Sequence, residues 1–343
     1  MSNKKISLFL IFSSIIAILV VSGCIGQSSG VTGSSSGIVV KNVYTDPQQD
    51  IIETGEDLNI FYELENIGGT TATNVRTTIY GFTWIPENDR LANYCYPKPS
   101  CNSGYTMYPP DPITKSPGGI QAINMKIPIR KDLLPAGLKK TFPLTIRSSY
   151  DYKTVATATL QGYSKNRYNR DIQLGNQQPV IAEASIPIQK TIADTPISIA
   201  ISGPDKMIVH DVASSGSFKF TYRITFSNIG QGYPITNGEE GLLVIKSLKI
   251  EGPGVTFSDC IDQTTQSNEL NGINVKLRGS SVTKSCTIEI TNSKSSQDSW
   301  YNREFNTINI YFDLDYRYFV EKSFSVSITA SPTYTGDGTC SNC

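Results

Sequence analysis

Apolar and polar residues alternate along most of this chain, from residue 38 to residue 330. A period of two is typical of β-strands that bury one face. In the first half the pattern predicts strands at residues 38–44, 57–65, 73–84, 121–129, 139–147 and 153–163. In the second half it predicts strands at residues 197–202, 217–228, 242–250, 272–277, 284–291, 305–313 and 322–330. Gly and Pro separate these runs, which favours an all-β fold of antiparallel sandwiches.

The strand pattern occurs twice. Asn66-Ile67-Gly68 ends one alternating run, and Asn228-Ile229-Gly230 ends another 162 positions later. Asp151-Tyr152 and Asp315-Tyr316 stand 164 positions apart, each between two apolar runs. These matches predict a duplicated unit. Because Asn and Gly both tolerate a left-handed backbone, the Asn-Ile-Gly segments are predicted to be turns.

The duplication predicts two tandem domains, since about 300 residues are more than one core usually serves. The expected divisions are a signal peptide, a tether, a first β-sandwich with an insertion, a second β-sandwich and a tail. Their ranges are residues 1–23, 24–37, 38–190 (insertion 85–120), 195–330 and 331–343.

The chain begins with the layout of a secretory signal peptide. Lys4 and Lys5 precede an apolar run at residues 6–21, which is followed by Ser22, Gly23 and Cys24. An uncleaved membrane helix is the alternative. A bilayer span needs about 20 apolar residues, whereas this run has 16 and contains Ser7, Ser13 and Ser14.

The segment Val21-Ser22-Gly23-Cys24 resembles the lipobox of prokaryotic lipoproteins. That resemblance implies cleavage before Cys24 and a lipid on its thiol. The Ser- and Gly-rich residues 24–37 then serve as a flexible tether. We therefore expect a body anchored to the extracytoplasmic face of the cell membrane.

Charge and cysteine content narrow the partners and the compartment. The chain has 30 basic and 30 acidic residues, and loss of Lys4 and Lys5 with the signal would leave 30 − 2 = 28 basic ones. This balance argues against nucleic acid as a partner. Besides Cys24, the other six of the seven cysteines lie in three pairs that are close in sequence, which suggests disulfides in an oxidising compartment. Six cysteines allow 15 pairings, so the connectivity is open. The expected pairs are Cys95 with Cys101, Cys260 with Cys286, and Cys340 with Cys343.

A second resemblance concerns the first domain. Residues 62–75 contain Asn66-Ile67-Gly68 followed by Ala72-Thr73-Asn74-Val75, and they resemble the hairpin of CARDB-like adhesion-related domains. Those domains are immunoglobulin-like modules of archaeal and bacterial surface proteins. In the second domain only Asn228-Ile229-Gly230 matches. The resemblance implies two immunoglobulin-like sandwiches, a surface setting and no catalytic residue.

The insertion at residues 85–120 is rich in proline and tyrosine. Rigid aromatic loops on a β-sandwich are typical of protein-binding surfaces. The alternative is that these aromatic side chains cover the end of their own domain. The candidate binding residues are Trp84, Tyr94, Tyr96, Tyr105, Met107 and Tyr108.

Other polar motifs carry weaker hypotheses. The Tyr- and Arg-containing loop at 163–170 is expected to be solvated, with an anionic glycan or membrane surface as its alternative partner. His210 is the one histidine, and it has no nucleophile beside it. The paired acids Asp313 and Asp315 would share a strand face, where a calcium site is conceivable but lacks the usual loop of oxygen ligands. Cys340-Ser-Asn-Cys343 is expected to be a tail disulfide or free thiols rather than a redox or zinc site.

These observations predict a lipid-anchored surface protein without catalysis, cofactor or metal. Its role would be structural, adhesive or protein-binding, with another surface protein or an envelope polymer as partner. An alternative is an extracytoplasmic accessory subunit of a pilus, secretion or transport complex. A glycan hydrolase is a more distant third, because no two carboxylates can be placed across a cleft from sequence.

Overall fold

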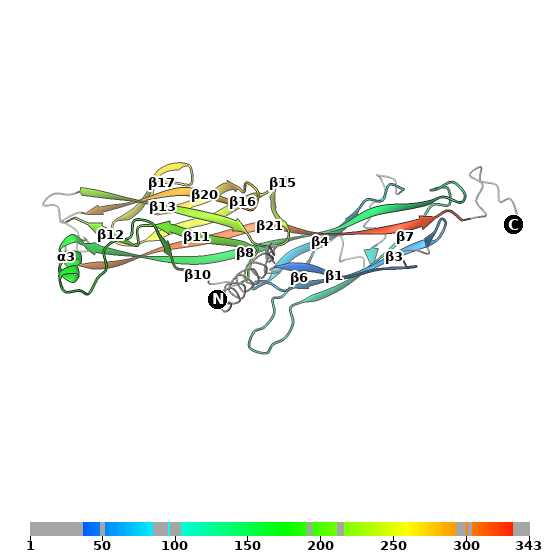
Figure 1. The fold of residues 1–343 in the computed structure, drawn as a ribbon, viewed down its shortest axis with the longest axis horizontal. Coiled ribbons are helices and arrows are strands. Elements are labelled where there is room, and N and C mark those ends of the chain that lie inside the picture. Colours follow the sequence, from blue (N-terminus) through cyan, green and yellow to red (C-terminus); the bar gives the residue numbers. More distant parts are fainter. Residues whose placement is uncertain are drawn as a thin grey trace, which may run out of the picture. The chain divides into compact units, whose positions relative to one another are not determined.

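The structure is a computed structural model that describes residues 37–48, 52–84, 95–96, 104–190, 194–210, 216–292, 300 and 304–331. Over these residues the fold is all-β, as the alternation predicts, with antiparallel sheets and one short helix (Figure 1). In this part of the chain no helix is long and apolar enough to cross a membrane. The expected signal peptide, Cys24 and all of the expected tether except Gly37 lie outside the described residues.

Two long strands organise the fold. Strand β8 (Lys139–Ser164) has 26 residues and strand β21 (Phe305–Thr329) has 25. They pair antiparallel over the full length of β21, from Phe305 opposite Tyr163 to Thr329 opposite Lys139. At about 3.4 Å per residue the paired region extends for roughly 80 Å.

The sequence pattern divided each of these strands in two, and this prediction is wrong. Every even-numbered residue of β8 from 142 to 160 is buried, so the alternation does not slip at Asp151-Tyr152. Short polar side chains at Ser148 and Thr154 occupy inward positions and hid the continuity. Asp151-Tyr152 and Asp315-Tyr316 therefore lie within strands rather than between them. Each long strand continues from the sheets of one half into the sheets of the other.

The first half stacks a four-stranded sheet on one end of the β8–β21 pair. Its strand order is β1-β3-β7-β5. The strands are β1 (Ile38–Asp46), β3 (Asp57–Asn66), β7 (Ile120–Pro128) and β5 (Cys95–Tyr96). Strands that extend the opposing sheet are β2 (Ile52–Glu53), β4 (Ala72–Tyr80) and β6 (Tyr105–Met107). The Tyr62 hydroxyl on β3 lies 2.9 Å from the Thr77 hydroxyl on β4, which ties the two layers together.

The second half stacks a six-stranded sheet of order β18-β17-β20-β13-β11-β9 against the other end of the pair. These strands are β9 (Ala184–Ile186), β11 (Ile197–Gly203), β13 (Gly216–Asn228), β17 (Val255–Cys260), β18 (Gln263–Ser267) and β20 (Ser281–Asn292). Strands that extend the opposing sheet are β10 (Ile188–Lys190), β12 (Lys206–Val209), β14 (Tyr233–Thr236), β15 (Glu239–Glu240), β16 (Leu242–Glu251) and β19 (Glu269–Lys276). Buried residues of both layers, among them Phe226, Ile288 and Phe312, belong to the hydrophobic core.

The two halves are not the contiguous domains expected from the sequence. Residues 161–164 of β8, which belong to the expected first domain, pair with β12 of the expected second domain. Residues 328–329 of β21 pair with β2 in the first half. Each half therefore depends on a strand from the other end of the chain, and the described body is one compact unit.

Residues 163–170, expected to be a loop, end β8 and begin helix α3 (Lys165–Gln173). Ser164 caps this helix by accepting a hydrogen bond from the Arg167 N–H. Arg167 and Arg170 both pair with Glu304 at the start of the β21 segment. The two arginines are thus used within the fold.

Candidate functional site

The candidate site lies where the two halves meet, and its frame begins with the Asn66 turn. The Asn66 side-chain amide donates to the carbonyls of Thr70 (2.8 Å) and Met107 (2.9 Å). Its oxygen accepts from the Gly68 N–H at 3.1 Å. A Cβ on Gly68 would lie 2.0 Å from the Tyr152 hydroxyl oxygen, which explains the glycine.

The second repeat builds the same turn. The Asn228 amide donates to the Gly232 carbonyl at 2.6 Å, and its oxygen accepts from the Gly230 N–H at 3.2 Å. A Cβ on Gly230 would lie 2.5 Å from the Tyr318 hydroxyl oxygen. Both Asn-Ile-Gly segments are therefore turns, as predicted, but the left-handed backbone expected there is wrong, because Asn66, Gly68, Asn228 and Gly230 all have negative or extended φ angles. The two glycines are needed for the close approach of a tyrosine hydroxyl instead.

Four tyrosines connect these turns to the long strands. The Tyr152 hydroxyl accepts from the Thr70 N–H at 3.3 Å, and the Tyr318 hydroxyl accepts from the Gly232 N–H at 3.1 Å. In the same way Tyr150 accepts from the Ile38 N–H at 3.1 Å, and Tyr316 is hydrogen-bonded to the Ile197 backbone. Tyr150 in the first repeat is therefore equivalent to Tyr316 in the second, and Tyr152 is equivalent to Tyr318.

This equivalence corrects the sequence alignment, which matched Tyr152 with Tyr316. The true offset is 152 + 166 = 318, two residues longer than expected. The register places Tyr150 opposite Tyr318 and Tyr152 opposite Tyr316. The two repeats are thus related by an approximate two-fold axis that passes between Asp151 and Arg317. Burial raises the pKa of Tyr152 to about 12 and that of Tyr316 still further, so both hydroxyls stay protonated at neutral pH.

Charged side chains alternate on the opposite face of the same strands. Asp151 faces Arg317 across the pair, and Lys153 faces Asp315. The Arg317 guanidinium lies 3.5 Å from the Asp151 carboxylate and donates to the Ser149 hydroxyl at 3.0 Å.

Two lysines complete this charge network. Lys153 pairs with Asp313 at 3.0 Å, and Lys246 pairs with Asp315 at 3.0 Å. The hydrogen bond to Asp315 raises the pKa of Lys246. The expected shared face of Asp313 and Asp315 exists, but each carboxylate is paired with an ammonium group.

A cleft of about 780 Å³ opens over these charges. Both repeats line it, the first through the segment at Thr70 and the second through the segment at Thr236. Its lining residues are Thr70, Thr71, Thr73, Asp151, Tyr152, Lys153, Ile235, Thr236, Asn237, Val244, Asp315, Tyr316 and Arg317. Hydroxyl, amide and charged groups suit this cleft to hydrogen bonding with an extended polar ligand. Sequence analysis missed it, because its walls come from segments more than 160 residues apart.

The structure separates the candidate binding residues of the insertion into buried and exposed ones. Trp84 and Met107 are 4% and 2% exposed, so for these two residues the alternative holds: they pack against their own domain and do not face a partner. The Trp84 ring packs edge-on against Phe142 in the core, with ring centroids 5.0 Å apart. Tyr105 is half-buried on β6, which pairs with β4 despite the surrounding prolines. Tyr108 is 69% exposed.

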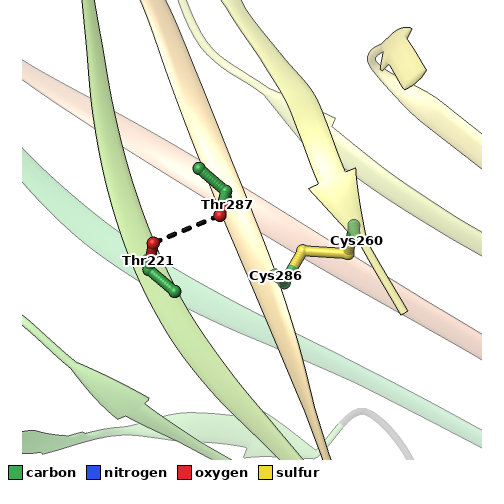
Figure 2. The surroundings of a disulfide bond; sticks show 4 residues. All are labelled: Thr221, Cys260, Cys286 and Thr287. Atoms are coloured by element: carbon green, nitrogen blue, oxygen red, sulfur yellow. Dashed lines mark hydrogen bonds between the residues drawn. A yellow bond between two sulfur atoms is a disulfide. The ribbon is translucent and has the colours of Figure 1, made fainter. Parts of the chain in front are cut away.

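The side chains of Tyr94 and Tyr96 lie outside the described residues, as do those of Cys95, Cys101, Cys340 and Cys343. The structure contains a disulfide between Cys260 on β17 and Cys286 on β20, one of the three expected pairs. Figure 2 shows this disulfide across neighbouring strands. Thr287 turns the other way and lies 3.1 Å from the Thr221 hydroxyl.

The remaining polar candidates are surface groups in the described part of the chain. His210 is exposed, with its ring stacked 6.0 Å from that of Phe218. Among the described residues, no group of three or more His, Cys, Asp or Glu side chains is arranged to hold a metal ion.

Comparisons with known proteins assign no family. No family model matches the chain, and no curated protein matches it. A protein of unknown function from Porphyromonas gingivalis W83 is 11% identical over 74% of this chain and 82% of its own, with a TM-score of 0.17. The structure of infectious bursal disease virus Gx strain is 9% identical over 84% of this chain and 82% of its own, with a TM-score of 0.11. Both scores are too low to carry an argument.

Proposed function

We propose that this chain is a lipid-anchored protein of the extracytoplasmic membrane face, with a structural and partner-binding role rather than a catalytic one. The proposed anchor is Cys24, and the proposed partner is an extended polar segment of another surface protein. The observation that carries the binding role is the central cleft, to which both repeats contribute equivalent segments. The resemblance of Val21-Ser22-Gly23-Cys24 to a lipobox supports the location.

The continuous β8–β21 pair supports the structural part of this proposal. A load applied to one half reaches the other along the covalent backbones of β8 and β21 and through the hydrogen bonds between these two strands. The described body also begins at the junction. Gly37 accepts a hydrogen bond from the Ile67 N–H at 2.8 Å, and Tyr150 holds the next residue, Ile38. A tether ending at Gly37 would therefore hold the body at its middle.

Co-purification from gently solubilised membranes tests the binding role. Thr73→Arg places a long cation in the cleft from an exposed strand position and should abolish recovery of the partner. Thr159→Arg is the matched control, because Thr159 is exposed on β8 but does not line the cleft. Equal recovery with both variants would refute binding at the cleft.

The same experiment separates the two forms of the function. Recovery of a fixed set of membrane proteins would favour an accessory subunit of a larger complex, whereas a single surface partner would favour the adhesive or structural role. Mass spectrometry of the mature N-terminus tests the anchor. A peptide that begins at Cys24 and carries acyl chains is the expected result, and an unmodified Met1 would overturn the proposed location.

A further inference from the structure

A hairpin at residues 108–119 leaves the first half between β6 and β7, and Figure 1 shows it as a loop that projects from the sheets. Two backbone hydrogen bonds close it. At the base the Gly119 N–H donates to the Tyr108 carbonyl at 2.9 Å, and at the neck the Asp111 N–H donates to the Ser116 carbonyl at 3.1 Å. The turn beyond the neck forms the tip.

The tip of this hairpin presents an apolar side chain to solvent. Ile113 is 90% exposed, and Pro112 beside it is exposed too. The Asp111 carboxylate accepts hydrogen bonds from the Ile113 N–H and the Thr114 hydroxyl, both at 2.8 Å, and these bonds order the turn at the tip. Lys115 adds an exposed positive charge next to the isoleucine. An ordered tip that combines an apolar residue with a cation is suited to the interface of an anionic bilayer.

The base of the hairpin lies next to the place where the proposed tether joins the body. The Asn66 N–H donates to the Gly119 carbonyl at 3.1 Å, and the following residue, Ile67, donates to the Gly37 carbonyl at 2.8 Å. A Cβ on Gly118 would lie 1.8 Å from the Asn66 carbonyl oxygen, so hairpin and turn are in close contact. The hairpin and the segment from Cys24 therefore meet the body at one place.

We propose that this tip is a second membrane contact, in which Ile113 enters the interfacial region and Lys115 pairs with anionic headgroups. The inference rests on the proposed lipid anchor. Gly37 follows Cys24 by 37 − 24 = 13 positions, and 13 extended residue steps reach at most about 45 Å. The anchor thus keeps the membrane surface within reach of the hairpin base.

Tryptophan fluorescence tests the contact directly. The chain has two tryptophans, Trp84 and Trp300, which are 4% and 1% exposed, so a tryptophan at the tip would be the accessible one among the described residues. The full mature protein carrying Ile113→Trp is reconstituted into vesicles of equal parts phosphatidylcholine and phosphatidylglycerol. The matched control is Leu174→Trp, which replaces a 66% exposed apolar residue next to helix α3.

The I113W emission should move to shorter wavelength on reconstitution and be quenched by brominated lipids, whereas the L174W emission should do neither. Adding Lys115→Glu to I113W should reduce the quenching. Equal spectra for I113W in vesicles and in detergent-free solution would overturn the proposal. The emission of I113W could also shift in native membranes but not in vesicles that contain only this protein and lipid. That result would overturn the proposal and assign the tip to a protein partner. The N-terminal mass tests the anchor separately, so the two failures are distinguishable.

Discussion

Replacement of Asn66 by alanine tests how strongly the Asn-Ile-Gly turn stabilises the folded body. Asn66 is 0% exposed and its side chain makes three hydrogen bonds, to Thr70, Met107 and Gly68. Each buried hydrogen bond contributes about 1 kcal/mol net, and its loss leaves a buried backbone group without a partner. We therefore expect Asn66→Ala to lower the free energy of unfolding by roughly 3–4 kcal/mol.

The assay is thermal unfolding followed by circular dichroism and calorimetry. For a body of this size, each 1 kcal/mol corresponds to about 2–4 °C in Tm, so a decrease of roughly 6–15 °C is expected. Asn59→Ala is the control, since Asn59 makes one exposed hydrogen bond, to the Asp46 carbonyl at 3.3 Å. That variant should lose less than about 1 kcal/mol.

Cooperativity is the second readout of the same experiment. Because β8 and β21 belong to both halves, the wild-type body should unfold in one transition, and Asn66→Ala should move that whole transition. The equivalent variant Asn228→Ala should move it as well. Two separate transitions, with only one displaced by each variant, would refute the conclusion that the long strands unite the halves. A Tm for Asn66→Ala no lower than that of Asn59→Ala would refute the stabilising role of the Asn66 turn.

Three further outcomes can be measured by the same methods. Replacing Cys260 and Cys286 together by alanine should cost roughly 3 kcal/mol in denaturant unfolding, because their disulfide closes a loop of 26 residues; unchanged stability would contradict this. Gly162→Ala would place a Cβ 2.1 Å from the Trp300 ring. It should lower the free energy of unfolding by about 1–3 kcal/mol and alter the tryptophan emission. Thermal unfolding identical to that of the wild type would argue against the close contact. Burial raises the pKa of Tyr152 from 10 to about 12, so its contribution to stability is complete below pH 10 and is lost as pH rises through about 12. Tyr152→Phe should therefore flatten the decline of Tm over that range, and an equally steep decline would show that Tyr152 does not contribute.

The strand content was predictable from the sequence because a period of two in apolar residues follows from the geometry of one strand. The Asn66 and Asn228 turns were predictable for a similar reason, since each is closed largely by groups within a few residues of the asparagine. The pairing of Cys260 with Cys286 was also suggested by nearness along the chain. These features depend on local stereochemistry.

The cleft, the continuity of β8 and β21 and the burial of Trp84 and Met107 were decided by tertiary structure alone. An aromatic residue in a proline-rich segment has the same local pattern whether it faces solvent or a core, and only the neighbouring strand decides between the two. Likewise, a polar residue at Ser148 or Thr154 looks like the end of a strand until the partner strand is known to continue past it. The chain by itself determined alternation and turns, whereas the pairing of distant strands placed Asp151 beside Arg317 and so formed the junction. Such pairing depends on contacts between residues far apart in sequence, which no local pattern encodes.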